Sequence, residues 1–133
     1  MWAYCMNCWS LVPAKDLNCP VCGKGVTAAS KSFDQKLLAA LSHPRPETRA
    51  RLCSLVGRRK MREAVPTLLR LLTEPDLYVR LAALEALGDI GDTGAVPTIE
   101  LLARENSIPI RQAARRALDR IRTRSAVERP SPP

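Results

Sequence analysis

The feature that most constrains this chain is a self-match at a spacing of 31 residues. Its clearest stretch is Ala64-Val65-Pro66-Thr67, which returns as Ala95-Val96-Pro97-Thr98. Single residues keep the same register: Pro44 matches Pro75, Gly57 matches Gly88, and Arg49 matches Arg80 and Arg111. A period of about 20–50 residues is typical of solenoids, in which each repeat is one supersecondary unit stacked on the next. The period therefore favours a binding surface over a catalytic pocket.

Apolar residues inside each period recur at spacings of three and four, which indicates helices with one buried face. Proline and glycine interrupt this pattern, so the chain is expected to be all-α with three antiparallel helix pairs. Asp76 is the expected N-cap of the fourth helix and Gly88 its expected end. The expected helices cover residues 33–41, 47–57, 61–72, 77–87, 96–102 and 108–122.

The second helix of each pair is expected to pack closely on the next. Its contact positions are Leu52 and Leu55 in the first pair, Ala83 and Ala86 in the second, and Ala114 and Ala117 in the third. We expect Val56, Leu87 and Leu118, which share one register position, to fill the core between pairs. A large side chain at Ala83 or Ala86 should then destabilise the fold by roughly 1–3 kcal/mol through overpacking.

Residues 75–102 resemble HEAT repeats of the type found in phycobilin lyases, and the resemblance extends over about residues 33–123. It implies an α-solenoid of three HEAT-like helix pairs. The first repeat departs from the pattern, because Arg58-Arg59-Lys60 stands where the second has Asp89-Ile90-Gly91. Most repeats of this kind are binding scaffolds, so the resemblance does not by itself imply lyase activity.

Two CxxC pairs precede the repeats: Cys5 with Cys8, and Cys19 with Cys22. Four thiolates in two knuckles suit a tetrahedral ion and leave no position open for substrate, so we expect one structural Zn²⁺. Residues 1–23 resemble a small zinc ribbon, with Trp9 in place of the glycine usual after the first pair. Rubredoxin-type iron and a redox dithiol are less favoured alternatives. The metal would supply folding energy that so short a segment lacks.

Composition bounds the setting of the protein. Paired cysteines without a signal-peptide pattern suggest a cytoplasmic protein, and no apolar run approaches the ~20 residues of a membrane span. The net charge of +8 is uneven: residues 45–62 hold 7 basic and 1 acidic side chains, residues 63–110 hold 3 and 8, and residues 111–133 hold 7 and 2. Residues 24–32 read as a linker and residues 124–133 as a disordered tail.

Candidate partner-binding residues fall into three groups. Leu77, Leu81 and Leu84 recur on one side of the fourth helix, where they either line a groove for an amphipathic helix or complete packing between repeats. Arg115 and Arg116 belong to a basic patch that continues through Arg120, Arg122 and Arg124, as a solvated capping face or as a contact for phosphate or an acidic partner. Trp2, Tyr4 and Trp9 either shield the metal site or grip a partner.

The remaining residues of chemical interest are few. The in-register arginines Arg49, Arg80 and Arg111 suggest a structural ladder that bonds turn carbonyls or neighbouring acids. His43, the single histidine, lies in a proline-rich turn and reads as a loop residue, while Cys53 reads as a packing residue. No catalytic constellation is recognisable, and we expect no enzymatic activity.

The sequence therefore predicts a non-enzymatic scaffold or adaptor that binds a protein partner, within a larger assembly, through its repeat surface. The ribbon would be a second contact module. Association with nucleic acid through the ribbon and the Arg-rich last helix is the alternative, and a phycobilin-lyase-like accessory role is less favoured. No small-molecule substrate and no membrane association are expected.

Overall fold

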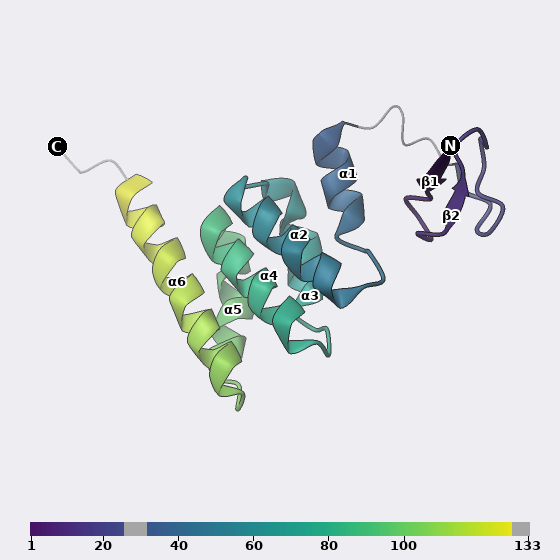
Figure 1. The fold of residues 1–133 in the computed structure, drawn as a ribbon. Coiled ribbons are helices and arrows are strands. Elements are labelled where there is room, and N and C mark those ends of the chain that lie inside the picture. Colours follow the sequence, from purple (N-terminus) through teal and green to yellow (C-terminus); the bar gives the residue numbers. More distant parts are fainter. Residues whose placement is uncertain (26–31, 129–133) are drawn as a thin grey trace.

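The computed structural model describes residues 1–25 and 32–128. Over these residues a small two-stranded sheet comes first and six α-helices follow (Figure 1). Strands β1 (Trp2–Tyr4) and β2 (Leu11–Pro13) pair antiparallel, with Ala3 opposite Val12. The helices are α1 (Phe33–Ala40), α2 (Pro46–Arg58), α3 (Val65–Leu71), α4 (Leu77–Ile90), α5 (Val96–Leu102) and α6 (Ile108–Glu128).

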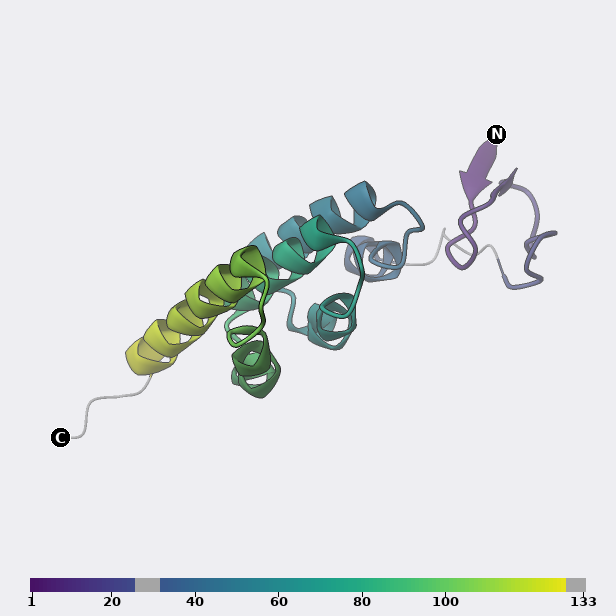
Figure 2. The ribbon, with the colours of Figure 1, turned by 90° about the horizontal axis from the view of Figure 1, so that it is seen from below.

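The helices form a two-layered solenoid. Helices α2, α4 and α6 lie side by side in one layer, and α1, α3 and α5 lie in the other (Figure 2). Helix α4 packs against both α2 and α6, so it is the centre of its layer. The predicted all-α solenoid of three helix pairs, preceded by a small cysteine module, is confirmed. None of the described helices combines the length and the apolar character needed to cross a bilayer.

Local sequence explains where the helices begin. Ser32 forms a capping box with Gln35 at the start of α1, with the Gln35 N–H donating to Ser32 Oγ at 3.2 Å. Asp76 caps α4 as predicted, because its Oδ1 accepts from the Val79 N–H at 3.1 Å. Pro66 and Pro97 lie in the first turns of α3 and α5, where a missing N–H costs no helical hydrogen bond. Short 3₁₀ turns, η1 (Arg62–Ala64) and η2 (Thr93–Ala95), lead into these two helices.

The predicted end of α4 at Gly88 is wrong. The helix continues to Ile90 and ends at Gly91, whose φ of +77° is the left-handed conformation that glycine adopts without strain. Helix α6 is also longer than predicted, since it passes Arg122 and includes residues 124–128 of the expected tail. Arg124, in the added length of α6, donates from its guanidinium to the carbonyls of Asp89 and Ile90, in the added length of α4.

Gly88 serves a different purpose, which it shares with Gly57. A Cβ on Gly57 would lie 2.7 Å from the Cα of Ala86, and a Cβ on Gly88 would lie 3.1 Å from the Cα of Ala117. These glycines therefore mark the points where α2 meets α4 and where α4 meets α6. Their spacing of 31 residues reflects helix-to-helix contact rather than helix termination.

The main core lies between the two helical layers. The residues predicted to fill the core (Val56, Leu87 and Leu118) are buried, and so are the predicted helix-contact alanines Ala83, Ala86, Ala114 and Ala117. Leu52 and Leu55 are half-buried at its margin. A separate small core in the cysteine module holds Cys5, Val12 and Cys19.

The predicted boundaries of the linker shift slightly. Lys24 and Gly25 belong to the cysteine module, since the Cys19 N–H donates to the Lys24 carbonyl at 2.8 Å and Asn18 bridges to Gly25. Ser32 belongs to α1 as its cap. The rest of the predicted linker, and the predicted disordered residues 129–133, lie outside the described residues.

Candidate metal centre and interaction surface

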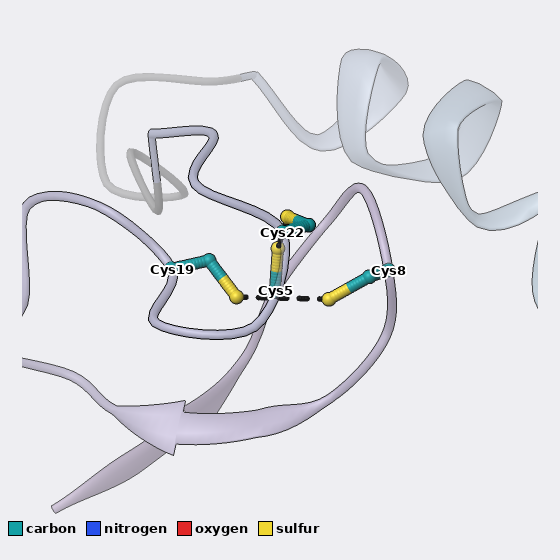
Figure 3. A group of neighbouring side chains, drawn as sticks. All are labelled: Cys5, Cys8, Cys19 and Cys22. Carbon is teal, nitrogen blue, oxygen red and sulfur yellow. Dashed lines mark hydrogen bonds between the residues drawn. The ribbon is translucent and has the colours of Figure 1, made fainter.

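The four paired cysteines converge on one point in the N-terminal module (Figure 3). Their Sγ atoms all lie within 4.8 Å of one another. The separations are 3.6 Å from Cys5 to Cys22 and 3.6 Å from Cys8 to Cys19. All four are free thiols rather than disulfides. The sequence prediction that these four residues form one site is met by this geometry.

The two CxxC segments fold into matching knuckles. In the first, Trp9 N–H donates to the Cys5 carbonyl at 2.8 Å and Asn7 N–H points at Cys5 Sγ at 3.4 Å. In the second, Gly23 N–H donates to the Cys19 carbonyl at 2.8 Å and Val21 N–H points at Cys19 Sγ at 3.4 Å. Backbone N–H groups aimed at sulfur stabilise thiolates and orient them toward a metal.

Trp9 occupies the position that Gly23 occupies in the second knuckle. Both residues have a left-handed backbone conformation, with φ of +63° at Trp9 and +74° at Gly23. The turn is therefore kept although the usual glycine is missing. A bulky residue is rarely found in this conformation, and it costs of order 1–3 kcal/mol.

This donor set fits a tetrahedral metal ion. A metal bonded to four sulfurs at ~2.3 Å places those sulfurs roughly 3.8 Å apart, close to the separations observed. Hydrogen bonds from the backbone of Cys8 and Asn7 lower the pKa of Cys5, and Ser10 lowers the pKa of Cys8 to about 6. The N–H of Cys22 acts in the same direction on Cys19, but burial and the adjacent sulfurs outweigh it and raise the pKa of Cys19 to about 11. A bound cation would hold all four as thiolates.

Four protein ligands would saturate such an ion. The site then has no open position for a substrate or a reactive water, which is the arrangement of structural rather than catalytic metal sites. A bound ion would act as a cross-link, because it would join the β1–β2 hairpin to the second knuckle.

The in-register arginines form a ladder along the solenoid. Arg49 Nη2 contacts Glu74 Oε2 at 2.7 Å, and Arg80 Nη2 contacts Glu105 Oε2 at 2.6 Å. Each arginine also donates to a turn carbonyl: Arg49 to His43, Arg80 to Leu72 and Arg111 to Glu105. The predicted structural ladder is confirmed. Its acidic members, Glu74 and Glu105, were not singled out, although they also lie 31 residues apart.

Two adjoining hollows follow the seam between α4 and α6. The first, of about 400 Å³, has Leu81, Ala113 and Ala117 among its walls and Glu85, Arg116 and Arg120 among its polar groups. The second, of about 480 Å³, begins at Arg120 and continues past Asp119 and Arg124 toward Val127. We call this pair of hollows the α4–α6 furrow. It combines apolar walls with three arginines (Arg116, Arg120 and Arg124) and three acids (Glu85, Asp89 and Asp119), and Arg120 is paired with Asp89.

Residues 35–128 match a family model for HEAT repeats. The match spans most of the chain and all three helix pairs. The chain belongs to the HEAT-repeat family. No curated protein matches it.

Within the HEAT repeats, the three leucines proposed for an outward face divide. Leu77 is 38 % exposed and Leu81 is half-buried on the wall of the furrow. Leu84 is 0 % exposed and belongs to the main core, so its assignment to a partner-binding surface is wrong. Helix α6 packs against α4, and it meets α4 at Gly88, one turn beyond Leu84.

The basic patch on the last HEAT helix divides in the same way. Arg120 pairs with Asp89 at 2.9 Å, Arg122 pairs with Glu100 at 3.2 Å, and Arg124 caps α4. Arg115 and Arg116 are exposed and make no ion pair with any described residue. These two are the arginines of the patch that remain available to a partner.

The three aromatic residues of the cysteine module differ in their exposure to solvent. Trp2 and Tyr4 are 64 % and 58 % exposed, on the strand β1. Trp9 is half-buried and packs against His43, with ring centroids 4.7 Å apart and planes tilted by 57°. His43 therefore contacts the cysteine module, a contact that its position in a proline-rich turn did not reveal.

Cys53 lies in the main core and is fully buried. Burial raises the pKa of its thiol to about 12, so it stays protonated at neutral pH. This agrees with its interpretation as a packing residue rather than a reactive or metal-binding one.

Proposed function

We propose that this HEAT-repeat protein is a non-enzymatic scaffold or adaptor whose α4–α6 furrow binds a protein partner. The observation that carries the proposal is the furrow itself, with half-buried Leu81 on its wall and exposed Arg116 on its rim. A groove with apolar walls and an arginine, Arg116, that has no ion pair among the described residues suits an amphipathic helix, whose apolar residues enter while a carboxylate meets that arginine. HEAT repeats are widely used as interaction scaffolds, which supports the same reading.

The ribbon is proposed as a second contact module with a structural role for its metal. We assign zinc, because a closed Cys₄ site in two knuckles is a common structural zinc arrangement and zinc needs no redox chemistry there. Elemental analysis of protein purified without added metal tests this assignment. One zinc per chain supports it, whereas iron with intense visible absorbance contradicts it. Paired cysteines that serve as metal ligands suit a reducing compartment, so we propose a cytoplasmic setting.

A charge reversal in the furrow tests the scaffold proposal. Tagged wild-type protein and the variant Arg116→Glu would be used to capture partners from native cells, with nuclease added to half of each lysate. Arg116 makes no ion pair with a described residue, so its reversal should leave the fold intact. The matched control is Arg104→Glu, an exposed arginine on α5's side of the solenoid.

The expected result is a defined protein that survives nuclease, binds wild type and Arg104→Glu equally, and is lost from Arg116→Glu. Equal capture by all three chains would place the partner elsewhere and overturn the furrow as its site. Circular dichroism of each variant confirms that loss of binding is not loss of fold.

Nucleic acid is the second candidate partner, because Arg115 and Arg116 are exposed on α6 and Trp2 and Tyr4 are exposed on the ribbon. Aromatic faces and arginines together suit unpaired bases and their phosphates. This candidate predicts that the captured material is lost on nuclease digestion. It also predicts a steep fall of affinity with salt, which the protein-partner proposal does not require.

A further inference from the structure

We propose that Trp9 couples metal loading of the cysteine site to the first HEAT pair, by docking on His43. This coupling joins the chain's own two modules and does not depend on the identity of any partner. It rests on three observations: the strained backbone of Trp9, the packing of its ring, and the register of His43 in the ladder.

The metal knuckle sets the backbone of Trp9. This residue directly follows Cys8, donates its N–H to the Cys5 carbonyl at 2.8 Å, and has a φ of +63°. Gly23 completes the second knuckle in the same conformation at no steric cost. Strain kept in a bulky residue where glycine would serve points to a role for the side chain.

The ring of Trp9 has a defined seat on the solenoid. Its centroid lies 4.7 Å from that of His43, and its indole Nε1 is buried without a hydrogen-bond partner among the described residues. A tilted pair at this distance is a favourable aromatic geometry. The indole is therefore held by ring packing rather than by a polar contact.

Several hydrogen bonds hold the turn that carries His43. The Arg45 N–H donates to His43 Nδ1 at 3.1 Å, and Arg49 donates to the His43 carbonyl at 2.7 Å and to the Pro44 carbonyl at 3.0 Å. Arg49 in turn contacts Glu74 at 2.7 Å, at the turn between α3 and α4. His43, on which Trp9 packs, is thus hydrogen-bonded to Arg49, the first arginine of the ladder.

The 31-residue register explains why the surface beside His43 is open to an aromatic side chain. His43 lies 31 residues before Glu74, which lies 31 residues before Glu105. Glu74 and Glu105 each receive an arginine from the preceding helix pair. No helix pair precedes His43 within the described residues, and Trp9 of the cysteine module takes the neighbouring position instead.

Loss of metal should therefore weaken the packing of Trp9 on His43. A module of about 25 residues has too little apolar core to keep its knuckles folded without a bound ion. When the knuckle opens, Trp9 loses both its fixed backbone and its alignment with the seat. The ribbon then becomes free to move relative to the HEAT repeats, and the His43–Arg49 turn loosens.

Fluorescence of Trp9 provides the first test. The chain has two tryptophans, so Trp2→Phe leaves Trp9 as the single tryptophan, and excitation at a wavelength that tyrosine does not absorb isolates its emission. In this background, full-length metal-loaded protein is compared with His43→Asn, whose side-chain oxygen still accepts from the Arg45 N–H but lacks the ring. We expect His43→Asn to keep one metal per chain and to shift Trp9 emission to longer wavelength, while His43→Phe keeps the emission of the parent. Unchanged emission in His43→Asn would overturn the proposal.

Hydrogen exchange provides the second test. Removing the metal from full-length protein should lower protection of the Arg45 and Arg49 amides on the order of tenfold, which corresponds to about 1.4 kcal/mol. Amides of α4 should be unaffected. The variant Trp9→Gly should bind metal at least as tightly as wild type and show the same loss of protection with metal present. Equal protection at Arg45 with and without metal, or full protection in Trp9→Gly, would contradict the coupling.

Discussion

At the scale of single residues, Arg80 shows how a repeated side chain can be structural. Its Nε donates to the Leu72 carbonyl at 2.9 Å while its Nη2 pairs with Glu105. The side chain is mostly withdrawn from solvent, so its partners would be left incompletely bonded if it were removed. Charged hydrogen bonds of this kind are worth more than exposed ion pairs.

We expect Arg80→Ala to lower the free energy of unfolding by about 1–3 kcal/mol, because Glu105 loses its partner and the α3–α4 turn loses its tie. The matched control is Arg122→Ala, which removes a well-exposed pair with Glu100 and should cost less than about 1 kcal/mol. Urea unfolding of both variants measures the difference. Equal losses would argue against a structural ladder.

The five cysteines should differ sharply in reactivity. Burial and a pKa raised to about 12 keep Cys53 protonated and inaccessible from neutral pH to about pH 9. With metal bound, we expect no labelling by a thiol reagent in the folded protein. Chelation should expose four thiols, and Cys53 should react after the HEAT repeats unfold. Early labelling of Cys53, mapped by mass spectrometry, would contradict its placement in the core.

At the scale of elements, the closest approaches are between helices of one layer. Gly57 faces the backbone of Ala86 on α4, and Gly88 faces the backbone of Ala117 on α6. Backbone atoms cannot rotate away as a side chain can. These contacts therefore fix how closely neighbouring repeats stack.

We expect Gly57→Ala to destabilise the protein although alanine favours helix by about 1 kcal/mol over glycine. The new Cβ would lie 2.7 Å from Ala86 Cα, and overpacking of this kind costs about 1–3 kcal/mol, enough to outweigh the helix gain. Gly88→Ala, with a clearance of 3.1 Å, should have a smaller effect. Thermal unfolding of the two variants checks the order, and a stabilised Gly57→Ala would refute the close contact.

The ends of elements depend on contacts across the seam between helices. Helix α4 passes Gly88 because its last carbonyls find Arg124 on α6, and α6 is prolonged by the same contact. Each helix therefore helps to define where the other ends. Gly91 marks the end of α4 locally, whereas the tie to Arg124 depends on tertiary packing.

At the scale of the whole molecule, the ribbon and the solenoid depend on different sources of stability. The solenoid has a continuous apolar core, whereas the ribbon core comprises two cysteines and Val12. Metal removal should thus abolish ribbon structure and leave the HEAT helices folded.

The prediction is that chelation leaves the helical circular dichroism signal almost unchanged, while NMR signals of the β1–β2 hairpin lose their dispersion. Cys22→Ser, which removes one ligand, should behave like the chelated protein without any chelator. Cys53→Ala serves as the control, since it lies outside the site and should leave metal content unchanged. Loss of most helical signal on chelation would show that the two modules fold as one unit.

Much of this molecule was predictable because its signals are local or periodic. Helical spacing, the 31-residue register and the Asp76 cap are set by neighbours along the chain, and the confirmed HEAT solenoid follows from them. The four cysteines were recognisable because ligand spacing within a knuckle is a local constraint. The ladder arginines were recognisable because each repeat places them in the same environment.

Tertiary structure alone decided which of these residues face solvent. Leu81 and Leu84 lie three residues apart on α4, but in the packed solenoid Leu84 is completely buried while Leu81 remains on the furrow wall. Likewise, neutralisation of Arg120 and Arg122 depends on acids brought near by packing, which leaves Arg115 and Arg116 free of ion pairs in the described structure. The sequence by itself determined the helical repeat and the four candidate metal-ligating cysteines, since both rest on regular or short-range spacing. Only tertiary packing decided how closely α4 approaches α6 and that Trp9 packs on His43, because these contacts join segments that are separated in the sequence.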